Sequence, residues 1–229
     1  MASEAAPSST PYADSIRVID TLHGHSVLLR PVSDEQLDNH LPPTAEALKH
    51  LPHAVGTQDG SAVRKQVTGE NGQLWGIHPI DKENQPAAEP LGFTAVKPGP
   101  EGLLETSTML FDPVEHGGKG YGTAAKLGIM AVAFEAGTPW FGAGIAADND
   151  ASQRSAAKVG FVPLPKSMAQ ESSMRTGPDG DSAKWATWMA FNPYTEYLGA
   201  PAMVAESQQA FHDAARRYRV EADTVATKL

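Results

Sequence analysis

The chain has no cysteine among its 229 residues. This absence excludes disulfides, thiolate-ligated zinc and a cysteine nucleophile. Long apolar runs are also absent, since no stretch approaches the roughly 18 residues that cross a bilayer. Residues 1–15 are rich in Ala, Ser and Pro and lack the apolar core of a secretory signal. We therefore expect a cytoplasmic protein that has no membrane partner.

Positive charge is scarce. The chain has 18 Lys and Arg against 27 Asp and Glu, a formal net charge of −9. A nucleic-acid partner is therefore not expected, and a cationic partner or plain solubility fits better. The histidine pairs His23/His25 and His50/His53 have no third ligand near them in the sequence, so no metal is predicted.

Three regions are expected along the chain. Residues 1–15 read as a disordered tail, because they offer little apolar surface to offset the entropy of ordering. Residues 16–193 form one domain, and residues 194–229 form a C-terminal helical extension. An apolar stripe at helical spacing predicts one helix over residues 202–222, which packs on the domain or on a second copy, as in a homodimer.

The pattern within the domain predicts a mixed α/β fold. Strands 74–80, 91–97 and 103–111 follow one another through turns, which is typical of an antiparallel meander. A β-α-β-α-β run then follows, which is typical of a parallel or mixed sheet. Its elements are helix 123–136, strand 140–146, helix 151–159 and a strand from 161, with a last strand over 184–191.

The most informative stretch, residues 112–123, joins strand 103–111 to helix 123–136 and holds four glycines at 117, 118, 120 and 122. Glycine lets backbone approach a ligand, and a helix N-terminus favours a phosphate. The P-loop pattern fails because Gly120 follows Lys119. The dinucleotide fingerprint is met only nominally, because no acid ends strand 140–146. A flexible connection is the remaining plain interpretation.

A second segment narrows the choice. Residues 117–122, following Phe111-Asp-Pro113, are similar to the Gln/Arg-x-x-Gly-x-Gly/Ala signature of the GNAT superfamily of acetyl-CoA-dependent N-acetyltransferases, although Gly117 replaces the usual Gln or Arg. Residues 149–161 resemble that family's Asn-x-x-Ala/Ser…Lys-Leu-Gly-Phe segment, in the right order. With Ser152 at the Ala/Ser position, this segment is most similar to the branch of the family that includes the ribosomal-protein N-terminal acetyltransferases.

The resemblance implies a central mixed sheet that is splayed at the strand before the glycine loop and flanked by helices. It also implies acetyl-CoA as the cofactor. The backbone of residues 109–111 would pair with pantetheine, residues 118–123 would hold the pyrophosphate, and Asn149 would bond the pantetheine arm. Arg154 is placed near the 3′-phosphate or on a solvated helix face. The implied cofactor-binding residues are Met109, Leu110, Phe111, Gly117, Gly118, Lys119, Gly120, Tyr121, Gly122, Thr123, Asn149, Ser152 and Arg154.

The catalytic groups are less clearly indicated. Many members of the family carry a tyrosine as general acid at the position of Ala156, so that acid is absent. Glu105 stands where relatives carry a base, or is a solvent-facing strand acid, and Ser107 shares its strand face. The resulting hypothesis is acetyl transfer from acetyl-CoA to a primary amine by direct attack in a ternary complex. The amine would bind between residues 34–68 and loop 164–182. The alternative is a non-catalytic acyl-CoA-binding module that acts as a sensor or scaffold.

Overall fold

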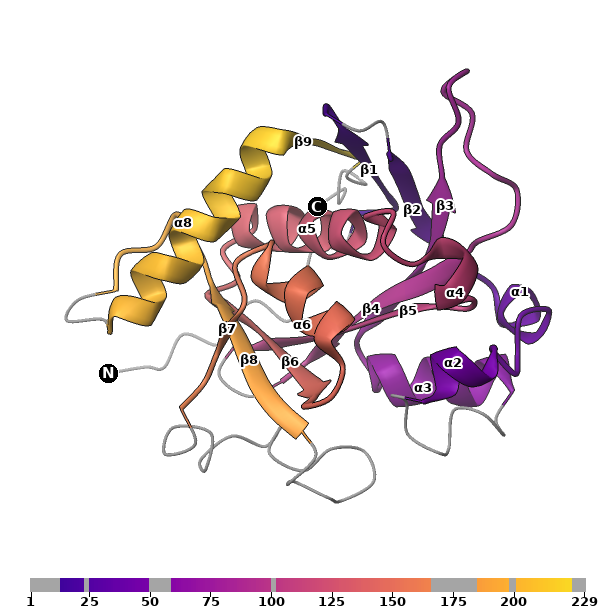
Figure 1. The fold of residues 1–229 in the computed structure, drawn as a ribbon, viewed down its shortest axis with the longest axis horizontal. Coiled ribbons are helices and arrows are strands. Elements are labelled where there is room, and N and C mark those ends of the chain that lie inside the picture. Colours follow the sequence, from indigo (N-terminus) through magenta and orange to yellow (C-terminus); the bar gives the residue numbers. More distant parts are fainter. Residues whose placement is uncertain are drawn as a thin grey trace, which may run out of the picture.

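The structure, a computed structural model, describes residues 13–22, 25–49, 59–99, 102–165, 185–197 and 201–223. Within them one mixed sheet has the strand order β7-β8-β6-β5-β4-β3-β2-β1-β9 (Figure 1). The strands are β1 (Ser15–Asp20), β2 (Val27–Pro31), β3 (Gln73–Pro79), β4 (Gly92–Pro98), β5 (Leu104–Leu110), β6 (Trp140–Ala146), β7 (Val162–Pro163), β8 (Trp185–Phe191) and β9 (Tyr218–Asp223). The helices are α1 (Asp34–Asp38), α2 (Ala45–Leu48), α3 (Gly60–Thr68), α4 (Pro113–His116), α5 (Tyr121–Glu135), α6 (Asp150–Ala157) and α8 (Ala202–Arg217).

The strand pairing confirms the predicted mixed sheet. Strands β1 to β5 pair antiparallel with their neighbours in sequence, as the predicted meander requires. β5 and β6 pair in parallel, because α5 crosses from the end of one strand to the start of the other. β8 then pairs antiparallel with β6 and with β7.

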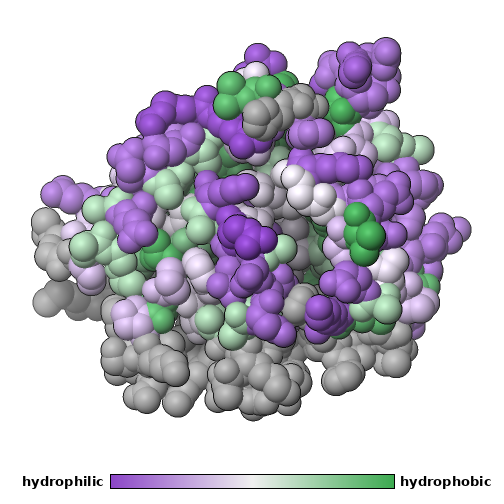
Figure 2. All heavy atoms as spheres, in the orientation of Figure 1, coloured by the Kyte–Doolittle hydropathy of each residue, from purple (hydrophilic) through white to green (hydrophobic). Residues whose placement is uncertain are grey.

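Helices cover both faces of the sheet (Figure 1). The larger core lies under α5, whose Leu127, Met130 and Phe134 are buried among strand residues. α5 lies directly on β1, because a Cβ on Gly128 would stand 2.6 Å from Val18 Cγ2. The smaller core, on the other face, packs side chains of α1 and α3 against β3, β4 and β5; its members are Val32, Leu37, Val63, Leu74, Phe93, Ala95, Met109 and Phe111. The face seen in Figure 2 is mainly hydrophilic, with hydrophobic side chains scattered over it.

The C-terminal segment differs from the prediction. The expected helix 202–222 ends at Arg217, and the chain continues as β9, which pairs with β1 along its whole length. Helical periodicity could not reveal this change, because a free edge on β1 supplies the partner for an extended chain. Ser15, the last residue of the predicted tail, is the first residue of β1, a strand that the sequence did not reveal.

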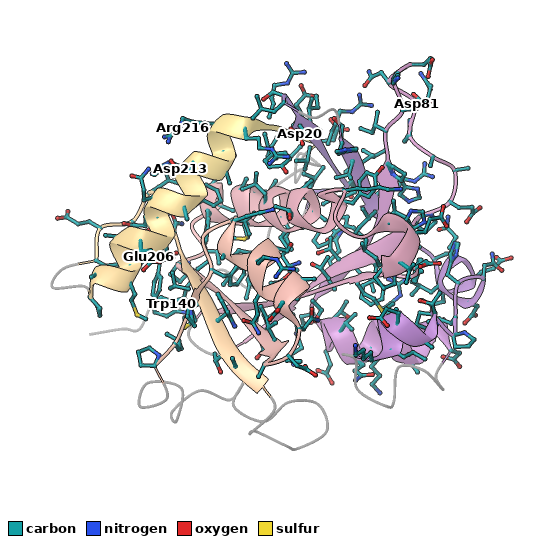
Figure 3. The ribbon with its side chains drawn as sticks, in the orientation of Figure 1. Asp20, Asp81, Trp140, Glu206, Asp213 and Arg216 are labelled. Atoms are coloured by element: carbon teal, nitrogen blue, oxygen red, sulfur yellow. The ribbon has the colours of Figure 1, made fainter. Side chains whose placement is uncertain are left out.

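An ion pair fastens this end of the chain. Arg217 donates to both carboxylate oxygens of Asp20, at 2.7 and 3.3 Å, and the Asp20 side chain is fully buried. Asp20 lies beside the end of α8, whereas Asp213 and Arg216 point away from the domain (Figure 3). The buried residues of α8, Phe211 and Ala214 among them, are covered by the same chain. The extension is therefore part of the domain's core rather than an appendage.

Candidate active site

Strands β5 and β6 pair at one end only. Their pairing joins Leu104 to Phe141 and Glu105 to Gly142, although both strands continue well beyond these residues. The strands therefore separate after Glu105. We call the opened edge between them the β5–β6 seam. It is the splay that the family resemblance implied at this strand.

Backbone groups of β5 are directed into the seam. Phe111 N–H donates to Leu91 C=O at 3.0 Å, and this pair lies in the same register as Phe93 and Met109. Because bonded and non-bonded residues alternate in an antiparallel pair, odd-numbered residues of β5 bond to β4. Thr108 and Leu110 therefore point their N–H and C=O groups the other way, past the last pair with β6.

The end of β5 is closed by the chain itself. The C=O of Phe111 accepts hydrogen bonds from the N–H and the hydroxyl of Thr44, at 3.1 and 3.2 Å. The Phe111 ring stacks on His40, with ring centroids 4.7 Å apart. Of the three residues predicted to pair with pantetheine, only Leu110 has backbone groups facing the seam. Phe111 instead packs against the helices of the opposite face, as Met109 does.

The vertex of the seam holds an unsatisfied polar group. The hydroxyl of Thr106, one residue past the last pair, is buried without a hydrogen-bond partner among the described residues. A buried hydroxyl in this state costs free energy unless a water or a ligand satisfies it. The Thr106 hydroxyl can therefore form a hydrogen bond with a polar atom of a ligand or with a water at the vertex.

The glycine loop lies at the open end of the seam. It begins with α4, which the sequence did not reveal and which Asp112 caps through bonds from Val114 N–H (2.9 Å) and Glu115 N–H (3.1 Å). Gly118 and Gly120 then take φ values of +74° and +88°. Side chains rarely adopt this left-handed region, so glycine is required at both positions.

The loop presents free donors. The N–H groups of the first turn of α5, at Tyr121, Gly122 and Thr123, have no acceptor within the helix. No side chain caps this helix, whose N-cap is Gly120, whereas α1, α3 and α6 are all capped by side chains. The bare donors and the helix dipole together suit an anion. Gly117 and Lys119 are exposed beside them, and Tyr121 packs edge-on against His25 at 5.8 Å.

A polar cluster lies between α5 and α6. Thr123 is buried, and its hydroxyl is 3.0 Å from the hydroxyl of Ser155 on α6. Lys126 is also buried and donates to the same Ser155 oxygen at 3.4 Å. Its pKa is lowered to about 8 because burial disfavours the charged amine. The Thr123 side chain is thereby committed to the helix contact, and only its N–H remains for a ligand.

The second predicted segment forms α6. Asn149 caps this helix, with Oδ1 accepting from Ser152 N–H at 3.0 Å. This bond uses the acceptor of the amide and leaves its Nδ2 donors for other partners. Ser152 is half-buried. Arg154 is exposed and lies 3.9 Å from Asp150 one turn earlier, so it occupies a solvated face.

The predicted catalytic residues lie on the face of β5 opposite α5. Glu105 pairs across the sheet with Lys97, at 3.0 Å between Nζ and Oε2, and its side chain is 23% exposed. Ser107 is exposed on the same face. Ala156 is fully buried in the larger core, so α6 presents a methyl group at the position where the family resemblance implies a tyrosine in many members.

Three residues near the loop were missed in the sequence. Lys126 and Ser155 were not among the candidate residues predicted from the sequence. Tyr218, from β9, has its hydroxyl 3.7 Å from the point where a Cβ on Gly120 would stand. Burial raises the Tyr218 pKa. A lysine on the apolar side of an alanine-rich helix is a signal that could have pointed to Lys126; nothing local points to Tyr218.

These features define a class: a mixed sheet splayed between two parallel strands, with an anion-binding glycine loop at the mouth of the splay. The sequence profile of the Acetyltransferase (GNAT) domain matches residues 26–162, more than half of the chain. The protein therefore belongs to the GNAT acetyltransferase family. No functionally curated protein matches the chain.

Solved structures share the fold. A GNAT-family acetyltransferase from Bacillus anthracis superposes with a TM-score of 0.53 at 17% identity, over 72% of this chain and 95% of its own. The phosphinothricin acetyltransferase of Sinorhizobium meliloti, solved with AcCoA, superposes with a TM-score of 0.52 at 17% identity, over 76% of this chain and 95% of its own. A T. thermophilus protein provisionally described as an acetyltransferase superposes with a TM-score of 0.56 at 23% identity, over 88% of this chain and 96% of its own.

Family membership supports an acyltransferase enzyme with acetyl-CoA as its substrate. Among the described residues, no three His, Asp or Glu side chains gather as metal ligands would. Within the same residues, every helix is too short or too polar to cross a membrane.

Proposed function

We propose that this protein transfers an acetyl group from acetyl-CoA to a primary amine by direct attack in a ternary complex. The observation that carries the proposal is the β5–β6 seam, which ends in a glycine loop whose helix donors have no side-chain cap. Coenzyme A matches both parts of this site, because its extended pantetheine arm carries two amides and its other part carries a diphosphate. The seam offers strand-like hydrogen bonds, and the loop offers N–H groups to an anion.

The site offers a hydrogen-bonding group to each part of acetyl-CoA. Thr108 and Leu110 present backbone N–H and C=O groups to the pantetheine amides, and Asn149 offers Nδ2 from the facing helix. The loop N–H groups of residues 118–123 hold the diphosphate. The buried Thr106 hydroxyl lies at the vertex, where the thioester end of the arm would arrive, and the thioester would supply its missing partner.

The amine would approach from the face of β5 that carries Glu105. A primary amine attacks only when it is neutral, so a base that takes its proton accelerates the reaction. We assign this role to Glu105, with Ser107 beside it on the same face. The Lys97 partner of Glu105 is partly exposed, so the pair between them is weak and yields to a substrate ammonium. The acceptor loop predicted at 164–182 lies outside the described residues from 166 on.

The proposed reaction is tested directly by measuring the free thiol of coenzyme A that acetyl transfer releases. Purified protein is incubated with acetyl-CoA and a panel of small amines and peptides with free N-termini, the peptides being included because of the Ser152 motif. We expect acceptor-dependent thiol release. Glu105→Gln should lower kcat by roughly 100-fold or more, the size of a typical base contribution, and leave the affinity for CoA unchanged. Tight CoA binding without thiol release across the panel would instead support the non-catalytic module.

Asn149 supplies a matched pair of variants. Asn149→Asp keeps the oxygen that caps α6 and removes the Nδ2 donor, whereas Asn149→Ala removes both. Helix stability should fall only in the alanine variant, by about 1 kcal/mol. We expect both variants to bind CoA more weakly. Unchanged binding in Asn149→Asp would remove this residue from the proposed cofactor site.

A further inference from the structure

Lys126 is a buried cation without a carboxylate. Its side chain runs back along α5 toward the N-terminus, so that a Cβ on Gly122 would stand 4.0 Å from Nζ and 3.8 Å from Thr108 Cγ2. The ammonium therefore lies at the junction of α5, α6 and β5, beside the glycine loop and the seam. Its hydrogen-bond partner among the described residues is the neutral hydroxyl of Ser155.

The acids on the neighbouring elements are engaged elsewhere. Glu105 lies on the face of β5 opposite α5 and pairs with Lys97. Asp150 of α6 lies near Arg154, and Asp20 of β1 binds Arg217. Of the remaining titratable groups that face α5, Tyr218 of β9 is neutral in its ordinary state and His25 contacts Tyr121. Lys158 adds positive charge on the exposed side of α6. None of these three acids is paired with the Lys126 ammonium.

This placement is unfavourable in the free protein for two reasons. Burial removes water from the ammonium, and the nearby N-terminus of α5 is the positive end of the helix dipole. The pKa of about 8 reflects the first of these. A buried cation that is disfavoured at rest and lies beside an anion-binding loop becomes favourable once an anion occupies that loop.

We propose that Lys126 is the buried counter-charge of the coenzyme A diphosphate and takes up a proton when acetyl-CoA binds. The inference rests on the proposed function, because it needs acetyl-CoA at the glycine loop. Lys126 acts as a positioning residue, through the field it adds beneath the loop and through its link to Ser155 and Thr123. The proton comes from solvent and adds to the fraction of Lys126 that is neutral in the free protein.

The test is calorimetric titration of acetyl-CoA into the wild-type protein, in two buffers of different ionisation enthalpy. The difference in heat counts the protons taken up. At pH 8 about half of Lys126 is neutral, so uptake should be about half a proton, falling to about a tenth of a proton at pH 7. Acetyl-CoA is used because its thioester does not titrate. S-acetylpantetheine, which lacks the diphosphate, should bind without uptake.

Two variants isolate the residue. Lys126→Met keeps the length and removes the charge; it should abolish proton uptake and weaken acetyl-CoA binding at pH 7 by roughly 10-fold to 100-fold, the range for a charge pair in a partly desolvated site. Lys126→Arg keeps the charge at every pH, so it should abolish uptake while retaining affinity at pH 7.

The outcomes separate the two proposals. Wild-type binding at pH 8 without proton uptake would overturn this inference and leave the proposed function standing. Equal uptake in Lys126→Met would do the same, as would equal uptake with S-acetylpantetheine. A protein that gives no binding heat with acetyl-CoA and no acceptor-dependent thiol release would instead contradict the proposed function itself.

Discussion

Phe211→Ala tests whether the C-terminal extension belongs to the domain's core. Phe211 is 1% exposed and meets the ring of Phe134 on α5 edge-on, with centroids 5.3 Å apart. Replacing a buried phenylalanine by alanine costs about 3–5 kcal/mol, because the transfer free energy is lost and a cavity remains. The aromatic pair adds roughly 0.5–1.5 kcal/mol. We expect the free energy of unfolding to fall by about 4 kcal/mol.

Urea unfolding followed by circular dichroism measures this loss. With a slope of about 2–3 kcal/mol/M for a protein of this size, the midpoint should fall by about 1–2 M. Glu206→Ala, on the exposed side of the same helix, is the matched control and should shift the midpoint little. A loss below about 1 kcal/mol in Phe211→Ala would mean that α8 does not contribute to the core, and would refute the reasoning.

Three further variants probe stability. Gly160→Ala should cost about 2–4 kcal/mol in urea unfolding, because φ is +100° and the new Cβ would stand 2.7 Å from Ser207 C=O; a neutral result would contradict that packing. Arg217→Met should cost about 1–3 kcal/mol by removing the ion pair with the buried Asp20 carboxylate, and an unchanged midpoint would contradict a stabilising role for this pair. Lys126→Met should raise the free-protein stability by up to about 3 kcal/mol at pH 7, from the lowering of the pKa from 10.5 to about 8. Because the unfolded chain binds the proton more tightly, this difference should vanish as pH rises from 8 through 10.5; a difference independent of pH would argue against a buried charge.

Local patterns accounted for the middle of the fold. The meander, the glycine loop, α5 and β6 all follow from periodicity and from glycine or proline punctuation, and the structure confirms them. The two ends of the chain were harder. β1 and β9 are paired with each other across nearly the whole sequence, and such a long-range pairing leaves no trace in a local window. The helix pattern of α8 therefore ran on into β9 in the prediction.

The residues of the candidate site likewise fall into those that local sequence predicts and those that depend on how the chain packs. Gly118, Gly120 and Asn149 could be identified because each has a local role in the backbone, as a left-handed residue or a helix cap. Which groups of β5 face the seam depends on the pairing register, and that register is a property of the sheet. The isolation of Lys126 from every described carboxylate likewise emerges only when α5, α6 and β5 are packed together.

A crystal structure of the protein with acetyl-CoA tests the central claim most directly. We expect the pantetheine arm between β5 and β6, with hydrogen bonds to the backbone of Thr108 and Leu110, and the diphosphate on the N–H groups of residues 118–123. Acetyl-CoA bound elsewhere, with β5 and β6 paired through the seam, would contradict the account.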